Sequence, residues 1–223
     1  MKSAVLGVLA GALTASAAQA AVVGVGDSTS PWLGFMNVFE LPSNGGAFVF
    51  ASPWGVADLV ATFDDANSNL TFSPNTIGDP NPFWYVGGGG PGAPGNKLME
   101  ANLYIETTDV LNGQNVTFQG SVISSSLTQA HQAFVFIRDF APDYSSVVET
   151  IVPLGAGPFS ISLATDPGAG RHVQYGFQMR GENVWVTDVG PFGNVMITTI
   201  PTPATAGLFA LAGVAAASRR RVG

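Results

Sequence analysis

The stretch AFVFIRDF, residues 133–140, decides the fold of this chain. The side chains of residues 134, 136, 138 and 140 alternate with those of residues 133, 135, 137 and 139, which is the period of a β-strand and not that of a helix. Residues 116–122 alternate in the same way. We expect these two strands to belong to a sandwich and to place Phe118, Phe134 and Phe136 in its interior, because large aromatic side chains dominate protein cores.

The same pattern continues on both sides of these two strands. Clusters of Gly, Pro, Asn and Asp separate the strand signals, as turns between short strands require. The further expected strands are residues 33–41, 47–50, 59–63, 98–107, 146–151, 159–163, 172–179, 183–187 and 195–199. Because no helical pattern interrupts them, the sequence predicts an all-β fold. We expect one antiparallel β-sandwich domain over residues 21–199, with the jelly roll as its commonest version at this size.

The amino terminus has the order of elements of a secretory signal peptide. Lys2 precedes the apolar run 4–13, and small residues, Ala18 and Ala20, occupy the positions that signal peptidase reads. This order predicts export and cleavage after Ala20. The first 20 residues are therefore excluded from the fold prediction.

The carboxyl terminus combines a short proline motif, an apolar segment and a basic cluster. Pro201-Thr202-Pro203 is followed by the uncharged residues 204–217 and then by Arg219, Arg220 and Arg221. Fourteen helical residues measure about 21 Å, less than the hydrocarbon core of about 30 Å. The arginines would remain on the cytoplasmic side. The sequence thus predicts a transient transmembrane helix in the inner membrane.

This three-part tail, residues 200–223, resembles the PEP-CTERM sorting signal of bacterial exosortase substrates. It differs at the motif, where the usual Pro-Glu-Pro is Pro-Thr-Pro here. The resemblance implies processing by an exosortase-type enzyme after signal peptidase has acted. It also implies a final location at the cell surface or in the extracellular biofilm matrix.

Charge limits the partners of the expected mature domain. The chain has 8 basic and 15 acidic residues. Removing Lys2 and the three terminal arginines leaves four basic against 15 acidic residues, a net charge of −11. Such a surface disfavours nucleic acids, because binding them requires neutralisation of phosphates by Lys and Arg. The absence of cysteine excludes disulfides and thiolate metal sites.

The second half of the expected domain also resembles jelly-roll modules of the carbohydrate-binding type. The likeness is carried by the strand series 116–122, 134–140, 159–162, 173–177 and 181–186. It implies an extracellular polysaccharide as a candidate ligand. The aromatic pair Trp84 and Tyr85, beside the glycine-rich residues 87–95, is the candidate glycan-binding site, because sugar rings stack on flat aromatic faces.

A second candidate site is an oxygen-rich segment. Asp64, Asp65, Asn67 and Asn69 could bind a structural calcium ion, and Asp79 with Asn81 is a similar pair. The alternative is a turn, since Asp, Asn and Ser form such turns without metal. No other cofactor is expected.

No set of residues in the sequence has the arrangement of a catalytic site. His131 and His172 are the only histidines, and neither has a neighbouring nucleophile and acid in a recognisable pattern. We therefore expect a non-enzymatic exported protein that binds polysaccharide. The alternative is a secreted glycan-active enzyme, a lyase or glycoside hydrolase, of jelly-roll fold.

Overall fold

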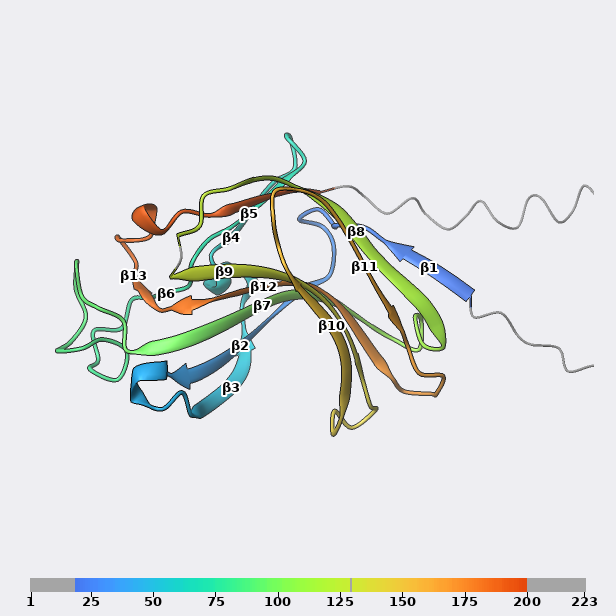
Figure 1. The fold of residues 1–223 in the computed structure, drawn as a ribbon, viewed down its shortest axis with the longest axis horizontal. Helices are drawn as coiled ribbons and strands as arrows, with labels where there is room; N and C mark the ends of the chain where they lie inside the picture. Colours follow the sequence, from blue (N-terminus) through green and yellow to red (C-terminus); the bar gives the residue numbers. More distant parts are fainter. Residues whose placement is uncertain (1–18, 129, 200–223) are drawn as a thin grey trace, which may run out of the picture.

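The computed structural model describes residues 19–128 and 130–199. Ala18 of the predicted cleavage site and the whole predicted sorting signal lie outside these residues. The described chain folds into two six-stranded sheets that pack face to face, with a two-stranded parallel pair at one end (Figure 1). The prediction of an all-β sandwich built mainly from antiparallel strands is confirmed.

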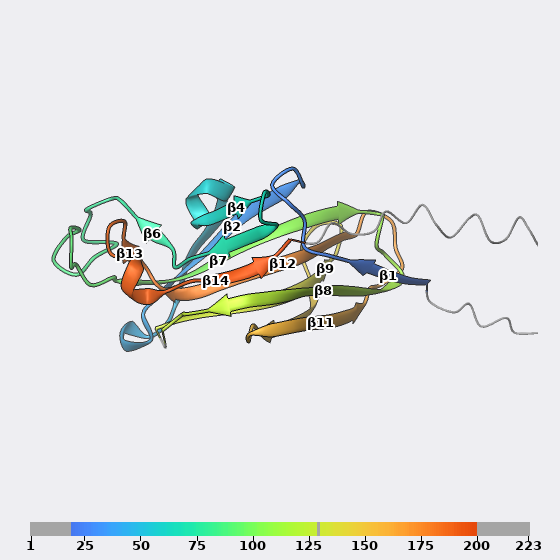
Figure 2. The same ribbon diagram turned by 90° about the horizontal axis from the view of Figure 1, so that it is seen from above.

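The first sheet, sheet A, is organised around β8. β11 (Gly157–Ala164) pairs with one edge of β8 (Gln114–Ser125). The other edge of β8 is shared by β1 (Gln19–Val23) and β14 (Val195–Thr198). Beyond β14 the sheet continues with β5 (Asn69–Phe72) and then β4 (Ala61–Asp64). Figure 2 shows β11 alongside β8 on the outside of the molecule. The β1–β8 pair is parallel, and the other pairs of this sheet are antiparallel.

The second sheet, sheet B, is fully antiparallel. Its order is β10 (Val147–Pro153), β9 (His131–Phe140), β12 (His172–Glu182), β7 (Lys97–Thr108), β2 (Trp32–Glu40) and β3 (Phe48–Trp54). The small pair consists of β13 (Val184–Trp185) and β6 (Thr76–Ile77). The chain passes repeatedly between the sheets, from β7 to β8 to β9 and from β10 to β11 to β12, as in sandwiches built from Greek keys.

One hydrophobic cluster fills the space between the sheets. Phe118 of β8 is fully buried, with ring centroids 5.3 Å from Tyr175 and 5.5 Å from Phe177 on β12. Val135 and Ile137 of β9 belong to the same cluster. The core prediction for Phe118 is therefore confirmed.

The prediction was wrong for Phe134, whereas Phe136 is buried as predicted but on the other face of the sheet. Successive side chains of a strand point to opposite faces, and the face of β9 that joins the core carries Ala133, Val135 and Ile137. Phe134 is half-buried on the other, outer face of sheet B. Phe136 lies on that outer face too and is fully buried, and the guanidinium of Arg138 lies over its ring, 3.9 Å from the centroid.

Three strands were not predicted from the sequence. β5 and β6 lie in stretches rich in turn-forming residues, and β1 overlaps the predicted signal peptide. β1 begins at Gln19, so cleavage after Ala20 would remove the residues that pair with Gln114 and Asn115. The cleavage site stays a prediction.

The glycine-rich segment, residues 87–95, is anchored to its surroundings. The backbone N–H of Gly92 donates to Asp188 Oδ2 at 2.6 Å, and Tyr85 forms a β-bridge with Gly95. A Cβ on Gly95 would lie 2.2 Å from the carbonyl oxygen of Asn183, so only glycine allows this close approach. Figure 1 places this loop beside β6 and β13 at one end of the molecule.

Helical structure in residues 19–128 and 130–199 consists of three short 3₁₀ turns, Pro42–Asn44, Val56–Leu59 and Gly190–Phe192. In this part of the chain no helix is both long enough and apolar enough to span a bilayer. The transmembrane helix predicted for residues 204–217 lies outside it.

Candidate functional site on the outer face of sheet B

A groove of about 690 Å³ crosses the outer face of sheet B. We call it the outer groove. It is within the range of small-molecule sites, which run from about 300 to 1,000 Å³. The residues that line it come from five strands and the turn after β9: Leu33, Gly34, Phe35, Asn37, Pro53, Asn102, Tyr104, Glu106, Arg138, Phe140, Tyr144 and Gln174.

Buried amides and one arginine form the floor of the outer groove. Asn102 Oδ1 accepts hydrogen bonds from Arg138 Nη1 and from Gln178 Nε2, both at 2.9 Å. Its Nδ2 donates to the carbonyl oxygens of Phe35 and Glu100. Asn102 and Gln178 are nearly inaccessible to solvent. Polar groups of this kind are stable in a protein interior only when they are hydrogen-bonded, as these are.

A carboxylate with three neighbours occupies one side of the groove. Glu106 accepts hydrogen bonds from Gln174 Nε2 at 2.7 Å and from the hydroxyl of Tyr144 at 3.0 Å. His172 Nδ1 lies 3.6 Å from the same carboxylate. These contacts hold Glu106 in one orientation at the groove wall.

Tyr144 reaches the groove from the turn that joins β9 to β10. Its φ of +56° lies in the left-handed region, which a bulky residue seldom adopts. Asp143 stabilises the turn by accepting hydrogen bonds from Ser145, and the Tyr144 ring stacks on His172 at 4.3 Å. Unfavourable backbone conformations of this kind concentrate at functional sites.

The two tyrosines of the groove remain protonated at neutral pH. Burial, followed by the hydrogen bond to Glu106, raises the pKa of Tyr144 to about 12. Burial and then the negative charge of Glu106 raise the pKa of Tyr104, while Arg138 opposes the shift. Both hydroxyls therefore act as hydrogen-bond donors or acceptors and are poor proton acceptors.

Some polar groups at the groove have no partner of their own within residues 19–128 and 130–199. The Tyr104 hydroxyl makes no hydrogen bond there, and Arg138 uses Nε on Glu149 and Nη1 on Asn102, which leaves Nη2 available. Leu33 and Phe35 supply apolar surface nearby, and Leu33 is exposed. The groove thus combines flat apolar surface with a few fixed polar groups, the usual composition of a binding site for a small polar molecule.

Comparisons of the chain with protein-family models, with curated proteins and with solved structures found no match. Its function therefore has to be inferred from the geometry of the outer groove and of the other cavities.

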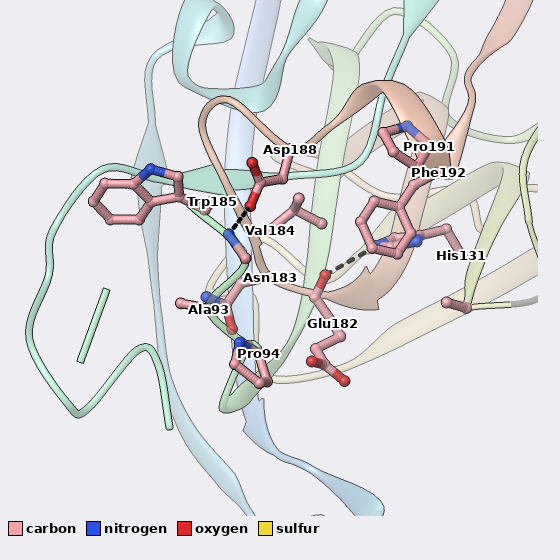
Figure 3. A pocket seen from close by; sticks show the side chains of 13 residues that line it. Ala93, Pro94, His131, Glu182, Asn183, Val184, Trp185, Asp188, Pro191 and Phe192 are labelled. Atoms are coloured by element: carbon pink, nitrogen blue, oxygen red, sulfur yellow. Dashed lines mark hydrogen bonds between the residues drawn. The ribbon is translucent and has the colours of Figure 1, made fainter. Parts of the chain in front are cut away.

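A second cavity, of about 400 Å³, lies at the end of the molecule where the glycine-rich loop meets β13 (Figure 3). Phe192, Pro191 and Trp185 give it apolar walls. Two of its polar side chains have structural partners: Asp188 accepts from Gly92, and Asn183 Oδ1 accepts from the N–H groups of Asn96 and Lys97. We call it the end cavity, and its side chains chiefly hold the loop in place.

His131 contributes to the end cavity and is buried. Its Nε2 donates to the carbonyl oxygen of Glu182 at 2.9 Å, since a carbonyl can only accept (Figure 3). Burial lowers the pKa of His131. The ring is therefore neutral at pH 7, and its buried Nδ1 has no hydrogen-bond partner among the described residues.

The aromatic pair predicted to bind glycan does not form an exposed platform. Tyr85 is fully buried, and its hydroxyl lies within hydrogen-bond distance of the carbonyl oxygens of Ile77 and Val184. This burial corrects the assignment of Tyr85 as a binding residue. Trp84 is half-buried and packs edge-on against Phe50 and Phe83.

The segment predicted to bind calcium forms the turn between β4 and β5. Asn67 donates from its backbone and side chain to the Asp64 carboxylate, and Asp65 accepts from the backbone and hydroxyl of Ser28. Asn69 is the first residue of β5. Residues 19–128 and 130–199 contain no group of three or more His, Cys, Asp or Glu side chains suited to a metal ion. The turn accounts for the contacts of Asp64 and Asn67, and the calcium site stays a prediction.

Proposed function

We propose that this protein is an exported, non-enzymatic cell-surface or extracellular-matrix protein that binds a polysaccharide in the outer groove of sheet B. The export part of the proposal rests on the signal-peptide pattern and on the sorting-signal-like tail with its implied exosortase-type processing. The binding part rests on the groove.

One observation carries the binding proposal: polar side chains on the floor of the groove are buried and hydrogen-bonded to each other, beside unpartnered donors and exposed apolar surface. A sugar ring presents both hydroxyl groups and an apolar C–H face. The hydroxyls would pair with the Tyr104 hydroxyl and Arg138 Nη2, and the C–H face would pack on Tyr144, Leu33 or Phe35. We expect an affinity of roughly millimolar to micromolar per site.

A secreted lyase is the second candidate, because the groove contains an arginine together with tyrosines. A lyase needs a base that removes a proton from the sugar and a positive charge that stabilises the neighbouring carboxylate. Because the pKa values of Tyr104 and Tyr144 are raised, both hydroxyls stay protonated near neutral pH and neither is available as a base. Arg138 is also partly neutralised by Glu149 at 2.9 Å. Binding without turnover is therefore the better-supported proposal.

Retention in gels that contain the exopolysaccharide of the producing organism tests the proposal. Tyr104→Phe removes a hydroxyl with no internal partner among the described residues, and Tyr144→Ala removes an exposed ring. Each should weaken retention by about two- to tenfold. Trp84→Ala is the matched control at the site predicted from sequence and should leave retention unchanged.

Loss of retention in Trp84→Ala, with full retention in both groove variants, would contradict the site. Release of reducing ends or unsaturated sugars during the assay would favour the enzyme instead.

A further inference from the structure

The two edges of sheet B differ in how they are protected. At the β3 edge the strand contains Pro53, its pairing with β2 is irregular between Val38 and Phe39, and 3₁₀ turns flank both ends. Proline and bulges are known devices that prevent a sheet edge from pairing with another chain. The opposite edge, β10, has proline only at its last residue, Pro153.

The register of β10 shows which of its backbone groups point outward. Hydrogen bonds from Ala141 N to Ser146 O and from Leu154 N to Ala133 O, both 2.9 Å, fix the alternation of the β9–β10 ladder. Even-numbered residues of β10 therefore bond to β9, while the N–H and C=O groups of Val147, Glu149 and Ile151 point away from it. Among the described strands, none pairs with this outer edge.

The side chains of β10 are also unusually apolar for an exposed edge. Val147, Val148 and Val152 are 45%, 48% and 40% exposed. The single charged side chain of the strand, Glu149, is neutralised within the chain by Arg138. An edge of this composition is suited to pairing with another strand of similar composition.

We propose that β10 pairs antiparallel with β10 of a second copy of this chain, about a two-fold axis at Thr150. This register places Val148 opposite Val152 of the other copy and Glu149 opposite Ile151, and it joins the outward backbone groups of residues 149 and 151. A register centred on Glu149 would place two carboxylates opposite each other, which is unfavourable. The sequence of β10 is thus complementary to itself in one register.

The resulting dimer has one continuous twelve-stranded sheet, because each copy contributes the six strands of sheet B. An isologous interface of this kind closes on itself and forms a dimer and not a filament. Both outer grooves would lie on the same sheet. Two grooves on one sheet would raise the avidity for polysaccharide, and this consequence rests on the proposed function. The proposal of the dimer itself does not rest on it.

Cysteine cross-linking tests the register, because the chain has no cysteine of its own. At a non-hydrogen-bonded antiparallel pair the two Cα atoms are about 4.5 Å apart, within disulfide range. In the protein as the cell produces it, Thr150→Cys should give a covalent dimer under mild oxidation. Val186→Cys, at an exposed position 50% accessible in a different loop, should not.

Sedimentation velocity over a wide range of concentration tests the edge itself. Ile151→Pro removes an outward N–H without touching the β9 ladder and should weaken the dimer at least about tenfold, since symmetry removes two hydrogen bonds. Val148→Lys should also dissociate it, and Val110→Lys, a control at a position 62% exposed, should not. Circular dichroism verifies that each variant folds.

A protein that is monomeric at all concentrations would overturn the proposal. The proposal would also be overturned by a dimer that persists in both the Ile151→Pro and the Val148→Lys variant. Equal cross-linking of the Thr150→Cys and Val186→Cys variants would overturn it as well.

Discussion

The two faces of sheet B are built from the same strands and differ in what they bury. On β7 the inner face carries Met99, Ala101, Leu103 and Ile105, all part of the hydrophobic core. The outer face of the same strand carries Glu100, Asn102, Tyr104 and Glu106, and Asn102 and Tyr104 are buried there as well. The inner face is buried by packing against sheet A, whereas the outer face buries polar groups by bonding them to one another.

This difference is consistent with the proposed function of the outer face. A face that only had to be soluble could leave its polar side chains in water at no cost. Burying an amide requires that its hydrogen bonds be replaced inside the protein. On the outer face the amides of Asn102, Gln174 and Gln178 are buried, so their hydrogen bonds to water have to be replaced by bonds within the protein. Such burial is expected of a surface that holds polar groups in fixed positions for a ligand.

The largest effect that tests the comparison is expected on the inner face. Phe118→Ala removes a fully buried ring that contacts Phe159, Tyr175 and Phe177. It should reduce the free energy of unfolding by about 3–5 kcal/mol, as core Phe→Ala changes do. Urea unfolding followed by circular dichroism measures it. A loss below about 1 kcal/mol would mean that the sheets do not pack through this residue.

An intermediate effect is expected at the polar floor of the outer groove. Asn102→Leu leaves Arg138 Nη1 and Gln178 Nε2 without their acceptor. The free energy of unfolding should fall by about 1.5–3 kcal/mol, since a hydrogen bond to a charged donor is lost. Asn37→Leu is a matched control on the same face, where the amide is half-buried and bonds only weakly, at 3.4 Å, to Glu100.

If Asn102→Leu proved as stable as the unchanged protein, the amide would not organise the outer face, and the contrast between the faces would be wrong. Equal losses in the two variants would indicate a general effect of leucine on this face.

The smallest effect is expected at Tyr144, which is 49% exposed. Because its pKa is raised to about 12 from an ordinary value near 10, the folded protein favours the protonated form. The stability from this group is complete below pH 10 and is lost as the pH rises from 10 towards 12. Ultraviolet difference titration against Tyr144→Phe should show a tyrosine that ionises near pH 12. Ionisation near pH 10 would show that neither burial nor Glu106 perturbs this hydroxyl.

Eleven of the fourteen strands in the described residues could be predicted from the sequence, because their side chains alternate with a period of two, whereas β1, β5 and β6 could not. The face of β9 that points inward could not, since Phe134 and Phe136 on one side and Val135 and Ile137 on the other are all apolar. Side-chain size favoured the phenylalanines, but the partner strands decide the orientation. Phe136 is buried all the same, beneath Arg138 on the outer face.

The outer groove was not predicted because its residues are far apart in the chain. Asn102, Arg138 and Gln178 lie on three strands, and only the register of sheet B brings them into contact. The polar residues of β7, at alternate positions from Glu100 to Glu106, were the one signal in the sequence that pointed to the outer groove. Trp84 and Tyr85 were conspicuous as neighbouring aromatic residues, but adjacency in sequence says nothing about exposure.

The central claim is that the outer face of sheet B binds the ligand, and chemical-shift mapping of backbone amides tests it most directly. Isotope-labelled protein would be titrated with oligosaccharide fragments of the exopolysaccharide. The largest shifts are expected at groove residues of four strands, such as Phe35, Tyr104, Arg138 and Gln174, with little change at Trp84 or around the end cavity. Shifts concentrated at Trp84, Trp185 and the glycine-rich loop, with none in the outer groove, would contradict it.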